Sequence, residues 1–335
     1  MRLHLNENTA GCSPAVIEAL RQLGRPEAGL YPEYEDARQA VAQHFRVPPD
    51  YVLLTNGLDE GILAACAAAF RDRAGGVPET VGVAPAFDMY ETCTTALGGR
   101  MVSVALPPDF EHSTEALLEA MTPATRAVFL ANPHNPSGVP LPLARLSHLA
   151  RAIAPVMLFV DEAYADFNGE TLIDPDVFDE VPSLLVGRTF SKAYGLAGLR
   201  IGAVLGSPGA LGPLRKVVPP YSLNAFATVA LPVAIADHAY RDWYISQARE
   251  SRAMLANACA RLELQTWPSA ANFVLVRVGP SIARVITALR AKGIRVRDRS
   301  SEPGCEFCIR ITAGVVADTR QVVTALEEAV CAARP

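Results

Sequence analysis

The sequence predicts an α/β fold in which a mainly parallel sheet is covered by helices on both faces, followed by a smaller α+β unit. In the first part of the chain, short apolar segments alternate with amphipathic segments of helical period, which is the pattern of βαβ units. After Pro219-Pro220 the pattern changes to long helical stretches and three further short strands. At 335 residues the chain is long enough for two domains.

The elements of the first part are predicted from apolar periodicity and turn residues. Ser13-Pro14 opens the first helix, which continues to about Leu23, with serine as N-cap and proline in the first turn. Further helices are expected over residues 33–45, 56–70, 88–97, 113–121 and 143–153. Strands are expected over residues 51–55, 81–83, 101–104, 127–131, 156–160, 184–186 and 199–205.

The second part is predicted to begin with helix over residues 226–262, including one long connecting helix from about Tyr240. Later strands are expected over residues 273–278, 294–297 and 307–312, and later helices over residues 281–292 and 318–333. We predict a large domain over residues 31–238. The small domain is predicted to combine residues 1–30 with residues 239–335.

Composition and charge exclude several classes of protein. A net charge of -5 gives no reason to expect nucleic acid or an anionic membrane as partner. No apolar stretch reaches the length of a membrane span. The seven cysteines are odd in number and scattered, and Cys305-Glu306-Phe307-Cys308 is a lone CxxC pair without further Cys or His partners. We therefore expect a cytoplasmic protein with no metal site.

Lysine is scarce in this sequence, and one lysine stands in an unusual position. Of the 30 basic residues only Lys192, Lys216 and Lys292 are lysines. Lys216 and Lys292 lie near expected helix ends, where a cation interacts favourably with the helix dipole. Lys192 follows the apolar run 184–186, in a segment of hydroxyl-bearing residues and glycines that ends at Arg200. Because a lysine pKa can be lowered while arginine stays protonated, we infer that Lys192 serves nucleophilic amine chemistry.

Four polar clusters lie at the ends of predicted strands or the starts of helices, where open α/β sheets bind their ligands. They are residues 131–138, 161–164, 189–200 and 56–60. Each cluster has an ordinary structural explanation when taken alone, because Asn-Pro and Pro-Ser-Gly are common turn sequences and a strand-terminal aspartate can cap the next element.

Together and in this order, the clusters resemble the fold-type I family of pyridoxal-phosphate enzymes. The motifs are Asn-Pro-His-Asn-Pro-Ser-Gly at 132–138, Asp-Glu-Ala-Tyr at 161–164, and Ser191-Lys192 followed by Arg200. They look most like the histidinol-phosphate aminotransferase group, and the resemblance covers nearly the whole chain. It implies a large domain with a mainly parallel seven-stranded sheet between helices, pyridoxal 5′-phosphate as cofactor, and a homodimer whose active site lies at the subunit interface.

The resemblance assigns roles around the cofactor ring. Lys192 would form the internal aldimine and then act as the base that moves the substrate Cα proton. Asp161 would pair with the ring nitrogen and keep it protonated, which makes the ring an electron sink. Asn135 and Tyr164 would donate hydrogen bonds to the 3′ oxygen, with Tyr164 also counted among the catalytic residues. Phe87 would stack on the ring.

The cofactor phosphate would be held by side chains and by a helix N-terminus. The resemblance assigns this role to Thr189, Ser191 and Arg200, together with the backbone amides of Leu58 and Asp59. A helix N-terminus with an arginine beside it is a suitable site for a phosphate group.

Further residues are implied in substrate binding and in the dimer. Arg310 matches the arginine that binds a substrate carboxylate, and Asn135, Asn8 and Tyr221 are expected beside the substrate. Tyr31 matches a tyrosine that reaches the cofactor phosphate of the neighbouring subunit. The sequence departs from the group after Asn8, where Thr9-Ala10 replaces the usual Pro-Tyr, so the substrate is left open.

The predicted function is a ping-pong aminotransferase that takes its amino group from an amino acid or an amino-alcohol phosphate and gives it to a 2-oxo acid. One alternative is a decarboxylase of the same fold acting on a phosphorylated amino acid, similar to threonine-phosphate decarboxylase. A second alternative is a non-catalytic protein that uses the fold to bind an effector. The decarboxylase differs in which Cα bond is held perpendicular to the cofactor ring, which the motifs do not reveal.

Overall fold

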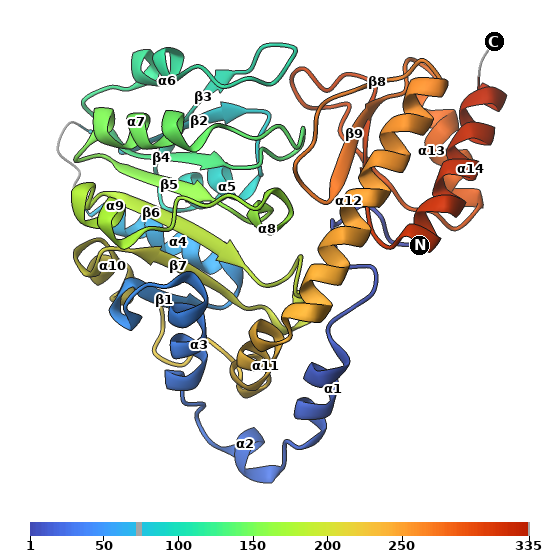
Figure 1. The fold of residues 1–335 in the computed structure, drawn as a ribbon. Helices are drawn as coiled ribbons and strands as arrows, with labels where there is room; N and C mark the ends of the chain where they lie inside the picture. The colour runs from blue at the N-terminus through green and yellow to red at the C-terminus, as the bar shows by residue number, and fades with distance from the viewer. Residues whose placement is uncertain (72–75, 334–335) are drawn as a thin grey trace.

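A seven-stranded sheet forms the centre of the larger part of the protein in this computed structural model, which describes residues 1–71 and 76–333 (Figure 1). The strand order is β1-β7-β6-β5-β4-β2-β3. The strands are β1 (Val52–Thr55), β2 (Glu79–Ala84), β3 (Arg100–Ala105), β4 (Thr125–Ala131), β5 (Met157–Asp161), β6 (Leu184–Thr189) and β7 (Gly202–Gly206). Each of the seven strands expected from the sequence overlaps one of these.

The sheet is mainly parallel, as predicted, and β7 is the exception. Strands β2 to β6 pair in parallel with their neighbours, whereas β7 runs antiparallel to both β1 and β6. Between β6 and β7 the chain forms only a loop with the short 3₁₀ helix η2 (Ala197–Leu199). A parallel crossover needs a longer connection, usually with a helix, so this loop returns the chain in the antiparallel direction. The loop that carries Lys192 therefore stays at the carboxyl end of β6.

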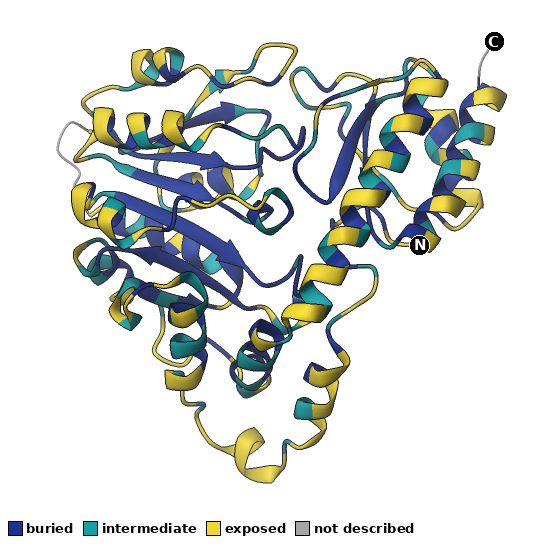
Figure 2. Ribbon diagram, in the orientation of Figure 1, coloured by how far each residue is buried: buried dark blue, intermediate teal, exposed yellow. Residues whose placement is uncertain are grey.

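Helices cover both faces of the sheet, and its strands are largely buried except for the edge strand β3, whose residues are half-buried or exposed (Figure 2). Alternate residues of one strand enter different cores: Leu158 and Val160 pack with one set of helices, and Phe159 packs with the other. The helices are α3 (Glu35–Phe45), α4 (Gly57–Ala69), α5 (Met89–Ala96), α6 (Thr114–Ala120), α7 (Leu143–Ile153), α8 (Ala165–Asn168), α9 (Pro175–Glu180), α10 (Pro208–Arg215) and α11 (Ala225–Ala236). Burial on both faces explains why the inner strands of the sheet are short continuous apolar runs.

A second, antiparallel sheet has the strand order β10-β11-β9-β8 and its own apolar core. Its strands are β8 (Gln265–Thr266), β9 (Phe273–Arg277), β10 (Arg297–Asp298) and β11 (Cys308–Thr312), and its helices are α12 (His238–Arg261), α13 (Ile282–Ala291) and α14 (Val316–Ala333). The long helix α12 runs from the larger part of the molecule to this sheet (Figure 1).

The N-terminal residues contact both parts of the molecule. Leu3 is buried in the core of the smaller sheet, and its backbone bonds residues 295 and 312. Helix α1 (Pro14–Arg21) instead packs on α11, and its Val16 belongs to the core of the larger sheet. Helix α2 (Arg25–Gly29) follows as an exposed turn of chain. The division of the chain into residues 31–238 and the remainder stays a prediction.

The expected strand over residues 294–297 is placed differently in the structure. Only Arg297–Asp298 pairs with β11, whereas Arg295 forms a bridge with Arg2 and Ile294 enters the core. Arg295 thus pairs with the N-terminal segment, and the local sequence pattern does not reveal this partner. Among the described residues, no helix is long and apolar enough to cross a membrane.

Candidate active site

A cleft of about 390 Å³ lies where the carboxyl ends of β4, β5 and β6 face the smaller sheet, and we call it the central cleft. Most of the site residues expected from the sequence line it. These are Leu58, Asp59, Phe87, Asn135, Asp161, Tyr164, Thr189, Ser191, Lys192, Arg200 and Arg310. They come from seven separate stretches of chain, and the parallel strands bring most of them to one edge of the sheet.

Asp161, the last residue of β5, is a buried carboxylate at the base of the cleft. Its Oδ1 accepts a hydrogen bond from the backbone N–H of Ala163 at 2.9 Å, and its Oδ2 accepts one from the Tyr90 hydroxyl at 2.8 Å. Burial raises the pKa of Asp161 to about 6 in spite of both hydrogen bonds. Within the described part of the chain Asp161 forms no ion pair, so a cationic group in the cleft would stabilise its charge.

Tyr90 is a site residue that the sequence did not reveal. It lies on α5, is almost fully buried, and stacks on Phe129 with ring centroids 5.5 Å apart. In the sequence it has the spacing of an ordinary core residue of a helix. Its contact with Asp161 depends on how α5 packs beneath the sheet, which no local signal gives.

Lys192 extends from the β6–β7 loop into the cleft. Its Nζ donates to the backbone carbonyl of Leu5 at 2.9 Å and lies 5.9 Å from the centre of the Tyr164 ring. The loop closes through Gly195, whose φ of +70° suits glycine. A Cβ at this glycine would lie only 2.2 Å from the carbonyl oxygen of Gly11, so the loop can pack directly on the N-terminal segment.

A second glycine shapes the other end of the cleft. Gly57 begins α4 with a φ of +73°, and a Cβ there would lie 2.6 Å from Nη2 of Arg200. The absence of a side chain lets the guanidinium approach the helix N-terminus, where the amides of Leu58 and Asp59 lie. Arg200 also bonds Oδ2 of Asp59 at 2.9 Å. With Thr189 and Ser191 nearby in the cleft, these donors fit a phosphate group.

Arg310, on β11, faces Asn135 across the cleft. Its Nη1 donates to Oδ1 of Asn135 and its Nη2 to the carbonyl of His4, the latter at 3.1 Å. Burial lowers the pKa of Arg310 to about 10, and its Nε has no hydrogen-bond partner. No described carboxylate forms an ion pair with it. A buried cation of this kind is suited to an anionic ligand.

Arg297 and Arg299 line the cleft together with Arg310, and neither was predicted from the sequence. Arg299 is buried and pairs with Glu302. The signal was present as the alternation of arginines at 295 and 297 in the strand expected over residues 294–297, which Arg299 continues beyond its end. Alternation places two of them on the same side as Arg310 of the neighbouring strand.

Three predicted residues lie outside the central cleft. Tyr31 is 77 % exposed and stacks on Tyr221, itself 54 % exposed, with ring centroids 4.2 Å apart. Asn8 is buried beside the Lys192 loop; its Nδ2 donates to the Ala193 carbonyl at 3.1 Å and its Oδ1 accepts from the N–H of Ala10 at 2.9 Å. The roles predicted for these residues stay predictions.

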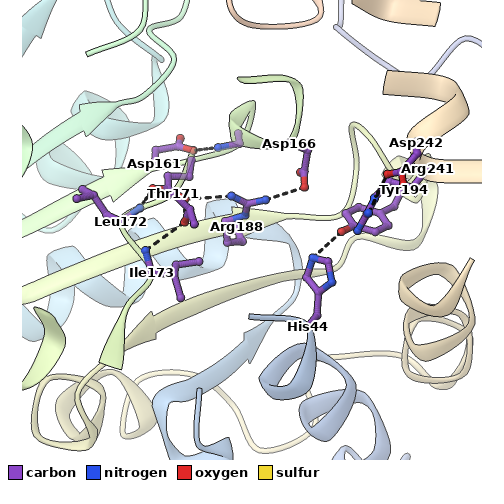
Figure 3. A network of polar contacts seen from close by, with 12 residues as sticks. His44, Asp161, Asp166, Thr171, Leu172, Ile173, Arg188, Tyr194, Arg241 and Asp242 are labelled. Atoms are coloured by element: carbon purple, nitrogen blue, oxygen red, sulfur yellow. Dashed lines mark hydrogen bonds and ion pairs between the residues drawn. The ribbon is translucent and has the colours of Figure 1, made fainter. Parts of the chain in front are cut away.

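A buried group of charges lies behind Asp161 and holds the ends of β5 and β6 together (Figure 3). Arg188 donates to Glu162 at 3.0 Å and to Asp166 at 2.8 Å, and all three side chains are less than 10 % exposed. Glu162 also accepts from the N–H of Leu172 at 2.6 Å. Because Glu162 follows Asp161 and Arg188 precedes Thr189, this group fixes two cleft residues relative to each other.

Comparison with known proteins agrees with this geometry. Residues 1–326 match the family described as aminotransferase class I and II. The chain belongs to the class I and II aminotransferases. A histidinol-phosphate aminotransferase of Cupriavidus pinatubonensis is 35% identical over 98% of this chain and 88% of its own length, and one of Methanosarcina mazei is 33% identical over 98% and 87%.

Solved structures also resemble this aminotransferase. The histidinol-phosphate aminotransferase of Sinorhizobium meliloti in complex with pyridoxal-5′-phosphate has a TM-score of 0.88 and 28% identity, covering 99% of this chain and 91% of that one. The L-threonine-O-3-phosphate decarboxylase of Porphyromonas gingivalis has a TM-score of 0.83, covers 98% of both chains and is 24% identical, which shows a shared fold alone. The fold-type I architecture expected from the sequence is thus confirmed.

The cofactor of this aminotransferase is pyridoxal 5′-phosphate, and its substrates are an amino donor and an oxo acid. The cleft fits that cofactor. The buried carboxylate of Asp161 has no cationic partner among the described residues, and a protonated ring nitrogen would be one. The space beside Gly57 and Arg200, which a side chain at Gly57 would fill, suits the phosphate. Lys192 presents an amine to the same cleft.

Proposed function

We propose that this aminotransferase transfers the amino group of histidinol phosphate, or of a closely similar amino-alcohol phosphate, to a 2-oxo acid. The observation that carries the proposal is the wall formed by Arg297, Arg299 and Arg310. Only one carboxylate, Glu302, pairs with these arginines among the described residues. Arg200, at the opposite end of the cleft, is left to the cofactor phosphate. A substrate phosphate in place of an α-carboxylate matches this excess of positive charge.

The relatives support the same substrate. The proteins of Cupriavidus pinatubonensis and Methanosarcina mazei that share about a third of their residues with this chain are histidinol-phosphate aminotransferases. The chain departs from the usual Pro-Tyr sequence after Asn8, where it reads Thr9-Ala10. We propose that Asn8 acts by holding the Lys192 loop through the Ala193 carbonyl.

The residues of the cleft divide the chemical work among themselves. Bound pyridoxal phosphate supplies the electron sink that stabilises negative charge at the substrate Cα. The Asp161 carboxylate would keep a proton on the ring nitrogen, while Asn135 and Tyr164 would donate toward the 3′ oxygen. The Lys192 amine would hold the cofactor and would also be the base for the substrate Cα proton. Phe87, which lines the cleft, would cover the ring and exclude water.

We also propose that two copies of the chain form the working enzyme. Tyr31 and Tyr221 form an exposed stacked pair, and Leu30 beside them is 71% exposed. Apolar side chains exposed together mark a contact surface. Tyr31 would then reach the cofactor phosphate of the second copy, and Tyr221 would line the edge of its cleft.

We propose the cytoplasm as the location of the protein. This compartment fits the seven free cysteines, since such thiols persist in a reducing compartment.

The test is a half-reaction with the cofactor-loaded protein, in which conversion to the amine form is followed by absorbance. We expect histidinol phosphate to react about a hundredfold faster than histidinol, equivalent to about 3 kcal/mol for a charge-assisted contact. Lys192→Ala serves as the inactive control. Equal rates for the two amines would refute the phosphate assignment. Release of CO₂ from a phosphorylated amino acid without the amine form would favour the decarboxylase alternative.

A further inference from the structure

Three consecutive residues near the N-terminus contact three groups of the central cleft. The carbonyl of His4 accepts from Arg310, and the carbonyl of Leu5 accepts from Lys192. The side chain of Asn6 bonds the Tyr164 hydroxyl at 3.0 Å. The first two contacts use backbone atoms, which any residue offers. The third uses a side chain, so the identity of Asn6 matters.

Asn6 is fully buried and is held on every side. Its φ of 55° lies in the left-handed region, which asparagine tolerates better than most residues. Its backbone N–H donates to Oγ1 of Thr312 at 3.1 Å, and its carbonyl accepts from Asn272 at 3.1 Å. Thr312 lies two residues after Arg310 on β11 and therefore on the same face of that strand.

The hydrogen bonds around Asn6 have a defined direction. Because the Thr312 hydroxyl already accepts from the Asn6 N–H, its proton is free to point to the Asn6 side-chain oxygen, 3.2 Å away. This turns the amide so that Nδ2, a donor only, faces Tyr164. The Tyr164 oxygen then accepts a hydrogen bond, and its own proton points elsewhere. Among the described residues no acceptor receives that proton, so it is available to an acceptor in the central cleft, which Tyr164 lines.

We propose that Asn6 is a positioning residue which, oriented by Thr312, forces Tyr164 to act as a hydrogen-bond donor toward the 3′ oxygen of the cofactor. A hydroxyl with a free choice of direction would spend part of its time as an acceptor or turned away. The series Thr312, Asn6, Tyr164 removes that choice. It also links β11, which carries Arg310, to the tyrosine. The inference requires the cofactor in this cleft, and it does not depend on which amine is the substrate.

The experiment measures the pH at which the absorbance of the lysine-bound cofactor titrates, with no substrate present. A donor to the 3′ oxygen stabilises its negative charge and lowers the titration pKa, so losing the donor raises it. We expect Tyr164→Phe to raise this pKa by about one to two pH units. Asn6→Gly, which accepts the left-handed backbone and adds no charge, is expected to raise it by about half a unit to one unit.

The double variant Asn6→Gly/Tyr164→Phe tests whether Asn6 acts through the tyrosine. We expect the double variant to have the same titration pKa as Tyr164→Phe, because a residue that only orients a hydroxyl has no effect once the hydroxyl is gone. An equal shift from Asn6→Gly in both backgrounds overturns the proposal, and so does an unchanged titration in the single variant.

Thr312 provides a second route that keeps the inference testable if Asn6→Gly does not fold. Thr312→Val removes the hydroxyl that orients the Asn6 amide, whereas the matched control Thr312→Ser retains it. We expect a raised titration pKa for the valine variant and the wild-type value for the serine variant. The same titration in both variants refutes the proposed direction of the hydrogen bonds. Failure of histidinol phosphate to react would leave these outcomes unaffected, because no substrate is used.

Discussion

Replacing Asp161 with asparagine should stabilise the cofactor-free protein at neutral pH while weakening its hold on the cofactor. The Asp161 carboxylate is buried, forms no ion pair with any described residue, and has a pKa raised by burial to about 6 from its ordinary value of 3.8. Asparagine has nearly the same shape and carries no charge. Its side-chain oxygen can still accept from the Ala163 N–H, and its amide can donate to the Tyr90 oxygen.

The sign and size of the effect follow from the pKa. Between about pH 4 and pH 6 the folded protein binds a proton at Asp161 that the unfolded chain has released, so its stability falls as pH rises through this window. A shift of about two units corresponds to about 3 kcal/mol. The Tyr90 hydroxyl loses its charged acceptor in the variant, which costs about 1 kcal/mol. We therefore expect Asp161→Asn to raise the free energy of unfolding by about 2 kcal/mol above about pH 6.

Chemical denaturation of the wild-type and variant proteins without cofactor, at about pH 4.5, 6 and 7.5, measures the gap between their free energies of unfolding. We expect the variant to be the more stable at about pH 7.5 and the gap to close toward about pH 4.5, where both side chains are neutral. With cofactor bound the order should reverse, because only the carboxylate pairs with a protonated ring nitrogen. A gap that is absent, or the same at every pH, would refute the account of Asp161 as an uncompensated buried charge.

Two further substitutions test other parts of the site. Arg310→Ala should reduce kcat/KM by the equivalent of about 2 to 4 kcal/mol, mainly through KM, because a buried charge-assisted contact with the substrate anion is lost; steady-state kinetics with an unchanged KM would place the anion elsewhere. Arg188→Met should lower the free energy of unfolding by about 3 to 5 kcal/mol, since Glu162 and Asp166 would remain buried without a cation. The exposed ion pair of Arg151 with Glu180 provides the control: Arg151→Met should leave the free energy of unfolding almost unchanged, and similar losses in both variants would contradict this reasoning.

Much of the larger sheet could be predicted from the sequence because its inner strands are buried on both faces. Runs such as residues 127–131 and 156–160 are continuously apolar for that reason, and polar motifs begin where they end. The class of enzyme and its cofactor, both suggested by those motifs, are confirmed by the family match. The roles of the individual cleft residues stay predictions, although the structure brings most of them together.

What the sequence could not supply depends on contacts between distant segments. Tyr90 looks like a core residue of a helix until α5 is packed under Asp161. Asn6 meets Thr312 across a separation of 306 residues, so no local pattern connects them. Residues 294–297 were expected to form a strand, yet Arg295 bonds the N-terminal segment instead of β11. In each case the partner is chosen by tertiary packing and not by local propensity.

The contacts of the N-terminal segment imply that its length is more tightly constrained than its composition. His4 and Leu5 reach Arg310 and Lys192 through backbone carbonyls, so many substitutions at these two positions would preserve both contacts. Leu3 is anchored on the smaller sheet, and Asn8 is anchored on the Lys192 loop. Inserting or deleting one residue between them would move each of residues 4, 5 and 6 by one position relative to its contact in the cleft. Variation among related enzymes should therefore consist of exchanges in this stretch, with gaps falling beyond its two anchors.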